Sequence, residues 1–454
     1  MPAPRQFALT GLLAAALGFQ PAAAQTPTST ELAAETDPQR LLGAAVTAQQ
    51  GGNLEAMEQA ALQLVRQRPQ IGAYGYLLAK SYALQDKKSE AYNVLLLLSN
   101  QGLTFDLTQD PDLENLRGYQ LFDYLVENFE KNAGAQGEVS ASVTLNGNGL
   151  LADGLAWDPK RRQFLVGSIT QGGVFVVEEN GALVPLVKAT RDNGLQGVFD
   201  LAIDHSRRAL WVASAGVPHY AGLRQDSLGY TGIFEFDLDS GEIRRRFDLP
   251  GRNAGNKLVN LAVAPDGSVF AANAARAEIF AIAAGTESMD RIFSAPKFTS
   301  IRGLAVSKDS ATLYFSDYEL GLFGIDLASR EPFQVRANAQ SNLGGIDSLA
   351  RHEDALIAVQ NGNSPHRALR IDLDDTGRSV AATQALLVNH PAFLAPNEGI
   401  VARGQFHLIA NSNAPLYDNR SGQVQAAAQL KPQTILSLDA AAQAQDFNEL
   451  RQAL

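Results

Sequence analysis

Leu155-Ala156-Trp157-Asp158-Pro159 is a short apolar stretch that ends in a turn, and it returns five times further along the chain in recognisable form. The later copies begin at Leu201, Leu261, Leu304, Leu349 and Ile400. They are spaced at intervals of roughly 43 to 60 residues, and each is followed by a polar turn and a second run rich in β-branched and aromatic residues. Short strands and turns repeated at such a period are typical of a propeller, in which each repeat is one four-stranded blade. The six copies therefore predict an all-β, six-bladed β-propeller.

A strand that lies before the first repeat is expected to close the ring. Val139, Ala141, Val143 and Leu145 alternate with polar residues, which predicts a strand over residues 138–145. The last repeat ends at Thr434–Leu438 without an obvious outer strand of its own, so we expect the N-terminal strand to complete it. The propeller is then predicted to cover residues 138–440, and residues 441–454 are predicted to form a helical tail.

The first residues have the pattern of a targeting segment. Arg5 precedes an apolar core, and Ala22-Ala23-Ala24 forms a small-residue cleavage site, which predicts a signal peptide over residues 1–24 and a periplasmic or secreted protein. No later apolar run is long enough for a membrane span, so none is expected. The chain has no cysteine, which excludes disulfides and thiolate sites, and its net charge of −11 argues against nucleic acid as a partner.

Residues 31–132 show helical periodicity. Small and large packing residues recur about 34 positions apart, and the spacing of Ala79, Tyr82, Ala91 and Leu95 resembles that of tetratricopeptide repeats, with Pro69 at the repeat-ending position. The resemblance covers about two repeats and predicts an N-terminal all-α, tetratricopeptide-like domain. Its role stays open between a packing appendage and a docking site for a cell-envelope protein.

The starts of two helices in this domain can be predicted from capping residues. Asn53 follows two glycines and is predicted to cap one helix. Asp86 or Ser89 is predicted to cap the corresponding helix of the next repeat.

Function in a propeller is expected at the mouth of the central channel, where the residues just before each repeat converge. Four of them are carboxylates and one is an amide, and hard oxygen donors of this kind suit calcium or another divalent cation. Asp200 and Asn260 lie one residue later in the repeat than Asp153, which would turn them towards a blade interface. Arg302 offers a competing account, because its charge could neutralise the carboxylates instead. The predicted metal ligands are Asp153, Asp200, Asn260, Asp347 and Glu398.

Three motifs make the chain resemble the senescence marker protein (regucalcin)/gluconolactonase superfamily of six-bladed propellers. They are Asp153-Gly154-Leu155, Leu313-Tyr314-Phe315-Ser316-Asp317 and Asn397-Glu398-Gly399-Ile400. The resemblance implies one divalent cation at the mouth, held by Asp153, Glu398 and Asp347, and lactone or ester hydrolysis as the activity. The chain departs from the family in blade four, where Arg302-Gly303 stands in place of an Asn-Gly ligand motif.

If the protein is such a hydrolase, calcium would polarise the carbonyl and a carboxylate would activate water. Asp347 or Asp153 is the expected base, with His219 and His366 in top-face loops as alternatives. Two long loops, Ala215–Thr231 and Asn411–Gln433, are predicted to wall a pocket over the mouth. No Gly-x-Ser-x-Gly element is present, which disfavours a serine hydrolase.

Two functions of different classes remain at this point. One is an exported, calcium-dependent hydrolase of a small lactone or ester. The other is a non-catalytic propeller that binds a small ligand or an envelope protein.

Overall fold

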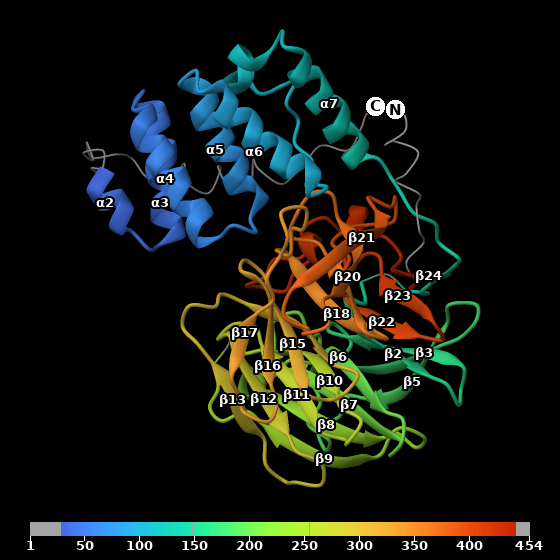
Figure 1. Ribbon diagram of the computed structural model, residues 1–454. Helices are drawn as coiled ribbons and strands as arrows, with labels where there is room; N and C mark the ends of the chain where they lie inside the picture. Colours follow the sequence, from blue (N-terminus) through green and yellow to red (C-terminus); the bar gives the residue numbers. More distant parts are fainter. Residues whose placement is uncertain (1–28, 148, 254, 442–454) are drawn as a thin grey trace.

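The computed structural model describes residues 29–147, 149–253 and 255–441. The predicted signal peptide and, apart from Ala441, the predicted helical tail lie outside these residues. Within them a helical domain precedes a ring of six sheets, and Figure 1 shows the helices gathered at one side of that ring. None of the described helices is long and apolar enough to cross a membrane.

The N-terminal domain consists of short helices, which confirms the expected helical region. Ala79, Ala91 and Leu95 are fully buried, as the tetratricopeptide-like pattern predicts. The helices are α2 (Ser29–Ala34), α3 (Pro38–Gln50), α4 (Leu54–Gln67), α5 (Gly72–Leu84), α6 (Lys88–Asn100), the 3-10 helix η1 (Pro111–Leu116) and α7 (Gln120–Ala133).

The helix starts are partly as expected. The Asn53 side chain caps α4 by accepting a hydrogen bond from the Ala56 amide at 3.1 Å. The prediction for α6 is wrong, because this helix begins after Lys87 without a side-chain cap. Lys87 instead pairs with Glu58 of α4, which ties the two repeats together.

The propeller has six four-stranded antiparallel sheets, which confirms the predicted blade number. The first three blades are β2 (Ala152–Asp158), β3 (Gln163–Ser168), β4 (Gly173–Val177), β5 (Leu183–Lys188); β6 (Gly197–Asp204), β7 (Ala209–Ala215), β8 (Thr231–Asp237), β9 (Ile243–Asp248); and β10 (Leu258–Val263), β11 (Val269–Asn273), β12 (Glu278–Ile282), β13 (Asp290–Ser294). The last three are β14 (Ile301–Val306), β15 (Thr312–Asp317), β16 (Gly321–Asp326), β17 (Pro332–Gln334); β18 (Ile346–His352), β19 (Ala355–Gln360), β20 (Arg367–Leu373), β21 (Val380–Val388); and β22 (Gly399–Ala402), β23 (Gln405–Ile409), β24 (Thr434–Asp439), β1 (Ala141–Thr144).

Blade six is completed by the strand that precedes blade one, as the sequence predicts. β1 pairs antiparallel with β24, with Ala141 opposite Ser437 and Thr144 opposite Thr434. The innermost strands β2, β6, β10, β14, β18 and β22 contact one another in a closed cycle. The ring is therefore closed in blade six, where β1 from the start of the propeller joins the three strands from its end.

Stability comes from apolar faces that are shared between neighbouring blades. Phe270 and Ile279 of blade three pack with Phe315 and Phe323 of blade four in one buried cluster. Comparable clusters join the other blades around the ring. A single blade cannot bury both of its faces, so the cluster at each joint depends on the whole ring.

The helical domain is fastened to the loops of blades four and five. Arg367 of β20 is 5% exposed, and its Nη1 donates to the Gln101 carbonyl at the end of α6 at 2.9 Å. Its Nε donates to Gln360 on the neighbouring strand. Arg68 forms a second link, an ion pair with Glu319 at 2.9 Å, but the Glu319 side chain is 37% exposed.

We expect these two arginines to differ sharply in their contribution to stability. Arg367→Met would leave the buried Gln360 amide oxygen and the half-buried Gln101 carbonyl without the donor that Arg367 supplies, which costs about 2–3 kcal/mol. Arg68→Met removes an ion pair whose acidic partner is partly exposed, and it should cost less than about 1 kcal/mol. Urea unfolding of both variants measures the difference, and equal losses would show that the buried link does not hold the two domains together.

Candidate functional site

The site is shaped by β-bulges that recur at the same level in five inner strands. In each of these strands one extra residue interrupts the pairing with the second strand near the mouth of the channel. A bulge turns the extra residue out of the regular alternation of the sheet, which re-aims its side chain. The bulges fall at Gly154, Phe199, Asn260, Arg302-Gly303 and Asp347.

Glycine is required at the first of these bulges. Gly154 has φ +80°, and a Cβ added there would lie 2.7 Å from the Cα of Asp200 in the next blade. The small residue lets blades one and two approach closely at the mouth. This packing explains why an Asp-Gly pair opens the first repeat without any appeal to metal binding.

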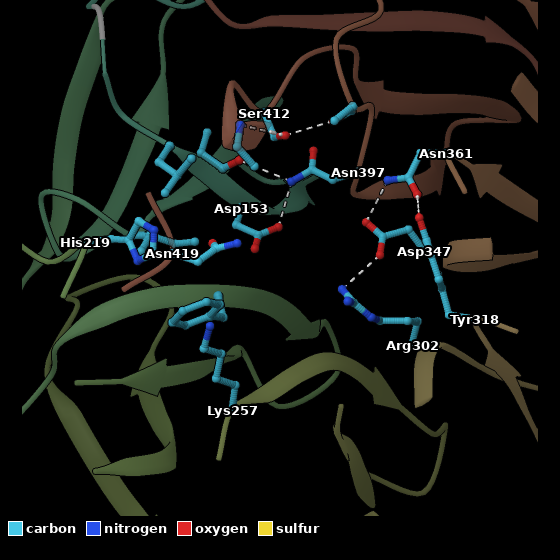
Figure 2. Close-up of a pocket in the computed structure, with 16 residues that line it drawn as sticks. Asp153, His219, Lys257, Arg302, Tyr318, Asp347, Asn361, Asn397, Ser412 and Asn419 are labelled. Carbon is cyan, nitrogen blue, oxygen red and sulfur yellow. Dashed lines mark hydrogen bonds and ion pairs between the residues drawn. The ribbon is translucent and has the colours of Figure 1, made fainter. Parts of the chain in front are cut away.

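The upper end of the channel holds a cavity of about 280 Å³. Carboxylates, cations and amides from different blades meet in it, and Figure 2 shows their side chains converging from several strands. Its polar lining includes Asp153, His219, Lys257, Arg302, Tyr318, Asp347, Asn361, Asn397, Ser412 and Asn419.

Arg302 and Asp347 form an ion pair in this cavity. Nη1 of Arg302 donates to one Asp347 oxygen at 3.0 Å, and Asn361 donates to the other at 3.1 Å. Tyr318 donates in turn to Asn361 at 2.8 Å and lies beneath the Arg302 guanidinium. Both oxygens of Asp347 thus accept hydrogen bonds from the protein (Figure 2). This agrees with the alternative that Arg302, and not a metal ion, neutralises charge at the mouth.

Asp153 is the carboxylate that remains available. One of its oxygens accepts a hydrogen bond from Asn397 at 2.7 Å, and the other has no hydrogen bond among the described residues. Burial and the neighbouring negative charges of Asp347 and Glu398 raise the pKa of Asp153 well above its usual range. A carboxylate with a raised pKa is a better proton acceptor than one free in water.

The other predicted metal ligands lie in a second, deeper layer. Glu398 accepts hydrogen bonds from Ser348 at 2.8 Å and from the Asn260 side chain at 3.0 Å. Asp200 accepts from its neighbouring amide Leu201 at 2.7 Å and from the amide of Leu261 in blade three. Asp200 therefore stabilises the interface between blades two and three. Its side chain points to a blade interface, as its position in the repeat predicts.

This lower layer faces the opposite end of the channel. Asp200 and Glu398 line a second cavity of about 470 Å³, whose wall also contains His205. Burial raises the pKa of Glu398 to about 7, and burial together with Glu398 raises the pKa of Asp200 well above its usual range. The two layers separate Asp153 and Asp347 from Asp200, Asn260 and Glu398.

The arrangement does not fit the expected calcium site. No group of three His, Asp or Glu side chains with the spacing of metal ligands occurs in the part of the chain that the structure describes. Asp347 is neutralised by Arg302, and the oxygens of Glu398 and Asp200 already accept hydrogen bonds from the protein. The five predicted ligands are thus divided between two layers and are largely occupied.

The two candidate histidines are placed differently. His219 lines the upper cavity, and burial followed by the charge of Lys257 lowers the pKa of its imidazole. His366 does not line that cavity, because its loop turns towards the helical domain, where the Ser364 carbonyl accepts a hydrogen bond from the Thr104 amide at 2.9 Å. The structure therefore brings His219, but not His366, to the site.

Both long loops form the wall of the upper cavity, as predicted. His219 comes from the first loop, whereas Ser412 and Asn419 come from the second. The loops also contact each other, with the rings of His219 and Tyr417 at 6.0 Å. They consequently narrow the opening above Asp153.

Several lining residues were not singled out from the sequence. Lys257 precedes β10 outside the repeat pattern, and Tyr318 and Asn361 follow their second strands by one residue. The polar residues at the strand ends, Asp317 and Gln360, are instead buried and hold the preceding loops by hydrogen bonds. The residue one position beyond the strand end would have identified Tyr318 and Asn361.

The similarity of this chain to known proteins is limited to solved structures of low sequence identity. No protein-family model and no curated protein sequence matches the chain. Among solved structures, regucalcin from Agrobacterium tumefaciens, a calcium-binding protein, is 15% identical and aligns over 66% of this chain and 93% of its own, with a TM-score of 0.44. A gluconolactonase from Xanthomonas campestris is 14% identical over 67% of this chain and 99% of its own, with a TM-score of 0.43.

A PQQ-bound aldose sugar dehydrogenase from Streptomyces coelicolor is similar to the same degree, at 15% identity over 68% of this chain and 98% of its own, with a TM-score of 0.45. The six-bladed fold expected from the repeats is confirmed by the sheet topology of the chain itself.

The raised pKa of Glu398 predicts a specific dependence of stability on pH. Its folded-state pKa of about 7 lies above the ordinary value of 4.5, so the folded protein holds a proton that the unfolded chain has released between these values. This group's contribution to stability must therefore fall as the pH rises from about 4.5 to about 7. The contribution of Glu398 to the free energy of unfolding cannot change by more than about 1.4 kcal/mol per pH unit.

Glu398→Gln removes the titration. The free energy of unfolding of this variant, relative to the wild type, should rise across that pH range in urea titrations. Glu242→Gln, at an exposed position, is the control and should give a flat difference. A flat difference for Glu398→Gln as well would contradict the raised pKa.

Proposed function

We propose that this protein hydrolyses a small lactone or ester at the upper mouth of the propeller channel, with side chains rather than calcium as the electrophilic groups. The observation that carries the proposal is the Asp153 carboxylate, which has one free oxygen and a raised pKa and shares a cavity of about 280 Å³ with Arg302 and Lys257. The cavity lies at the small end of the range for ligand sites, which suits a compact substrate.

The proposed chemistry uses Asp153 as the general base. Asp153 takes a proton from water, and the water oxygen forms a bond to the carbonyl carbon of the substrate. The carbonyl oxygen gains negative charge at that moment and would be stabilised by the Arg302 guanidinium, whose Nη2 makes no hydrogen bond within the described residues. The bond from the carbonyl carbon to the alcohol oxygen then breaks, and that oxygen takes the proton from Asp153.

Arg302 is held in place for this role. Its Nε donates to Ser300 at 3.0 Å, its Nη1 to Asp347 at 3.0 Å, and its plane lies over the Tyr318 ring. Asp347 is then a positioning residue for Arg302, in contrast to the expectation that it acts as the base. His219 stays a second candidate for proton transfer, since it lines the same cavity.

A non-catalytic binding function is the second candidate. It is favoured by the same Arg302–Asp347 pair, because a mouth whose charges are largely neutralised can hold a polar ligand without reacting with it. In this proposal the helical domain binds a partner protein. The protein is also proposed to be exported to the periplasm or the medium. Export rests on residues 1–24, which lie outside the described residues.

Asp153→Asn is the direct test of the hydrolase. The variant keeps the shape and the bond to Asn397 but cannot accept the proton, so kcat/KM for lactones and esters should fall by about 10²–10⁴-fold. Asp290→Asn, an exposed change on an outer strand, should leave the rate unaltered. Full activity in a folded Asp153→Asn variant would exclude this mechanism, and no activity in the wild type would leave the binding function.

Calcium gives an independent prediction. After chelation, added calcium should not change the melting temperature of the wild type, because the described part of the chain contains no group of three acidic or histidine side chains that could hold a metal ion. A real site at a calcium concentration of 100 times Kd would add about 2.7 kcal/mol to the free energy of unfolding. A rise in melting temperature that Asp153→Ala and Glu398→Ala both abolish would restore the calcium-dependent mechanism.

A further inference from the structure

Lys257 is a half-buried cation that faces the upper cavity without a counter-ion. Its ammonium makes no hydrogen bond or ion pair with any residue that the structure describes, and its closest aromatic contact is the Phe199 ring, 5.7 Å from the ring centre. Lys80, another part-buried lysine, shows the usual solution, since Asp110 and Asp112 pair with it at 3.2 and 2.6 Å. A buried charge is normally paired, so a half-buried ammonium without an ion pair suggests that Lys257 has a role in binding.

The surrounding charges do not supply the missing partner. Burial and the positive charge of Arg302 lower the pKa of the Lys257 ammonium, and the charge of Asp153 acts in the opposite direction although the two side chains form no ion pair. Asp347 is already bound to Arg302 and Asn361. Figure 2 shows the Lys257 side chain rising towards the cavity from below, across from Asp153.

We propose that Lys257 binds a carboxylate of the substrate, so that the substrate is a small lactone or ester with a separate acidic group. This inference rests on the proposed hydrolysis and specifies its substrate class. The acidic group would supply the counter-ion of Lys257, while the reacting carbonyl lies between Asp153 and Arg302. Lys257 is in this account a binding residue, distinct from the groups that perform the chemistry.

A carboxylate fits this wall better than a phosphate. Lys257 offers one compact charge, and the apolar Phe199 ring covers one side of it. Asp153 and Asp347 stand in the same cavity and would repel a dianion more than a monoanion. The site is therefore matched to a single negative charge.

The test compares two lactones with the same ring. D-glucaro-1,4-lactone carries a free carboxylate, whereas D-glucono-1,4-lactone carries a neutral hydroxymethyl group in its place. The wild type should have at least about a 10-fold higher kcat/KM for the acidic lactone, since one charge-assisted contact of about 1.4 kcal/mol gives this factor. Lys257→Met should remove the preference by raising KM for the acidic lactone, with kcat and the neutral lactone little changed.

Lys297→Met is the matched control. Lys297 also lies over a phenylalanine ring, 5.3 Å from the centre of Phe298, but its side chain is exposed and it does not line the upper cavity. The Lys297→Met variant should keep the wild-type preference for the acidic lactone. An equal preference for both lactones in the wild type, or an unchanged preference in Lys257→Met, would overturn the proposal.

Equilibrium binding separates this inference from the hydrolase itself. By calorimetry, D-gluconate, which carries one carboxylate, should bind the wild type, sorbitol should bind at least about 10-fold more weakly, and Lys257→Met should lose the difference. This result without any turnover would support the anion site and reject the hydrolase. Turnover of neutral lactones without D-gluconate binding would reject the anion site alone, as would tighter binding of inorganic phosphate than of D-gluconate.

Discussion

The pairing of β1 with β24 is the contact on which the rest of the structure depends. Each blade buries its faces only against its neighbours, so an open ring would expose the apolar surfaces of blades one and six. Their joint contains Leu155 and Ile409, both fully buried. β1 follows α7 after a short connection, so the strand that closes the ring also leads directly from the helical domain. The same chain segment therefore determines ring closure and joins the two parts of the molecule.

A closed ring fixes the inner strands, and the bulges then decide what the mouth can do. Regular strands would point alternate residues into the blade interfaces, whereas a bulge frees one residue at the rim. Phe199 and Asp347 reach the upper cavity in this way, and Asn260 turns down to Glu398. The resulting layers differ in chemistry. The upper layer contains cations and one available carboxylate, and the lower layer contains carboxylates that hold the blades together.

The sequence predicted the fold well because the repeat is a local pattern. Six copies of the Leu-Ala motif predicted six blades, and the alternation around Val143 predicted the closing strand. The site was predicted only in part. Asp153, Arg302 and Asp347 were placed at the mouth, but the depth of Asp200 and Glu398 depends on where each bulge falls, and a one-residue shift sends a side chain to the other face. Lys257 follows no repeat at all, so its approach to the cavity arises only from tertiary structure.

Charge balance links the missing calcium site to the proposed chemistry. Carboxylates gathered in a half-buried mouth need a positive partner, and a metal ion is one solution. This chain has Arg302 within hydrogen-bonding distance of Asp347, and the guanidinium supplies positive charge to this carboxylate without a metal ion. The second cation, Lys257, forms no ion pair within the described residues, although Asp153 lines the same cavity. The cavity therefore differs from a calcium site, because its carboxylates face cationic side chains of the protein and do not converge on one ion.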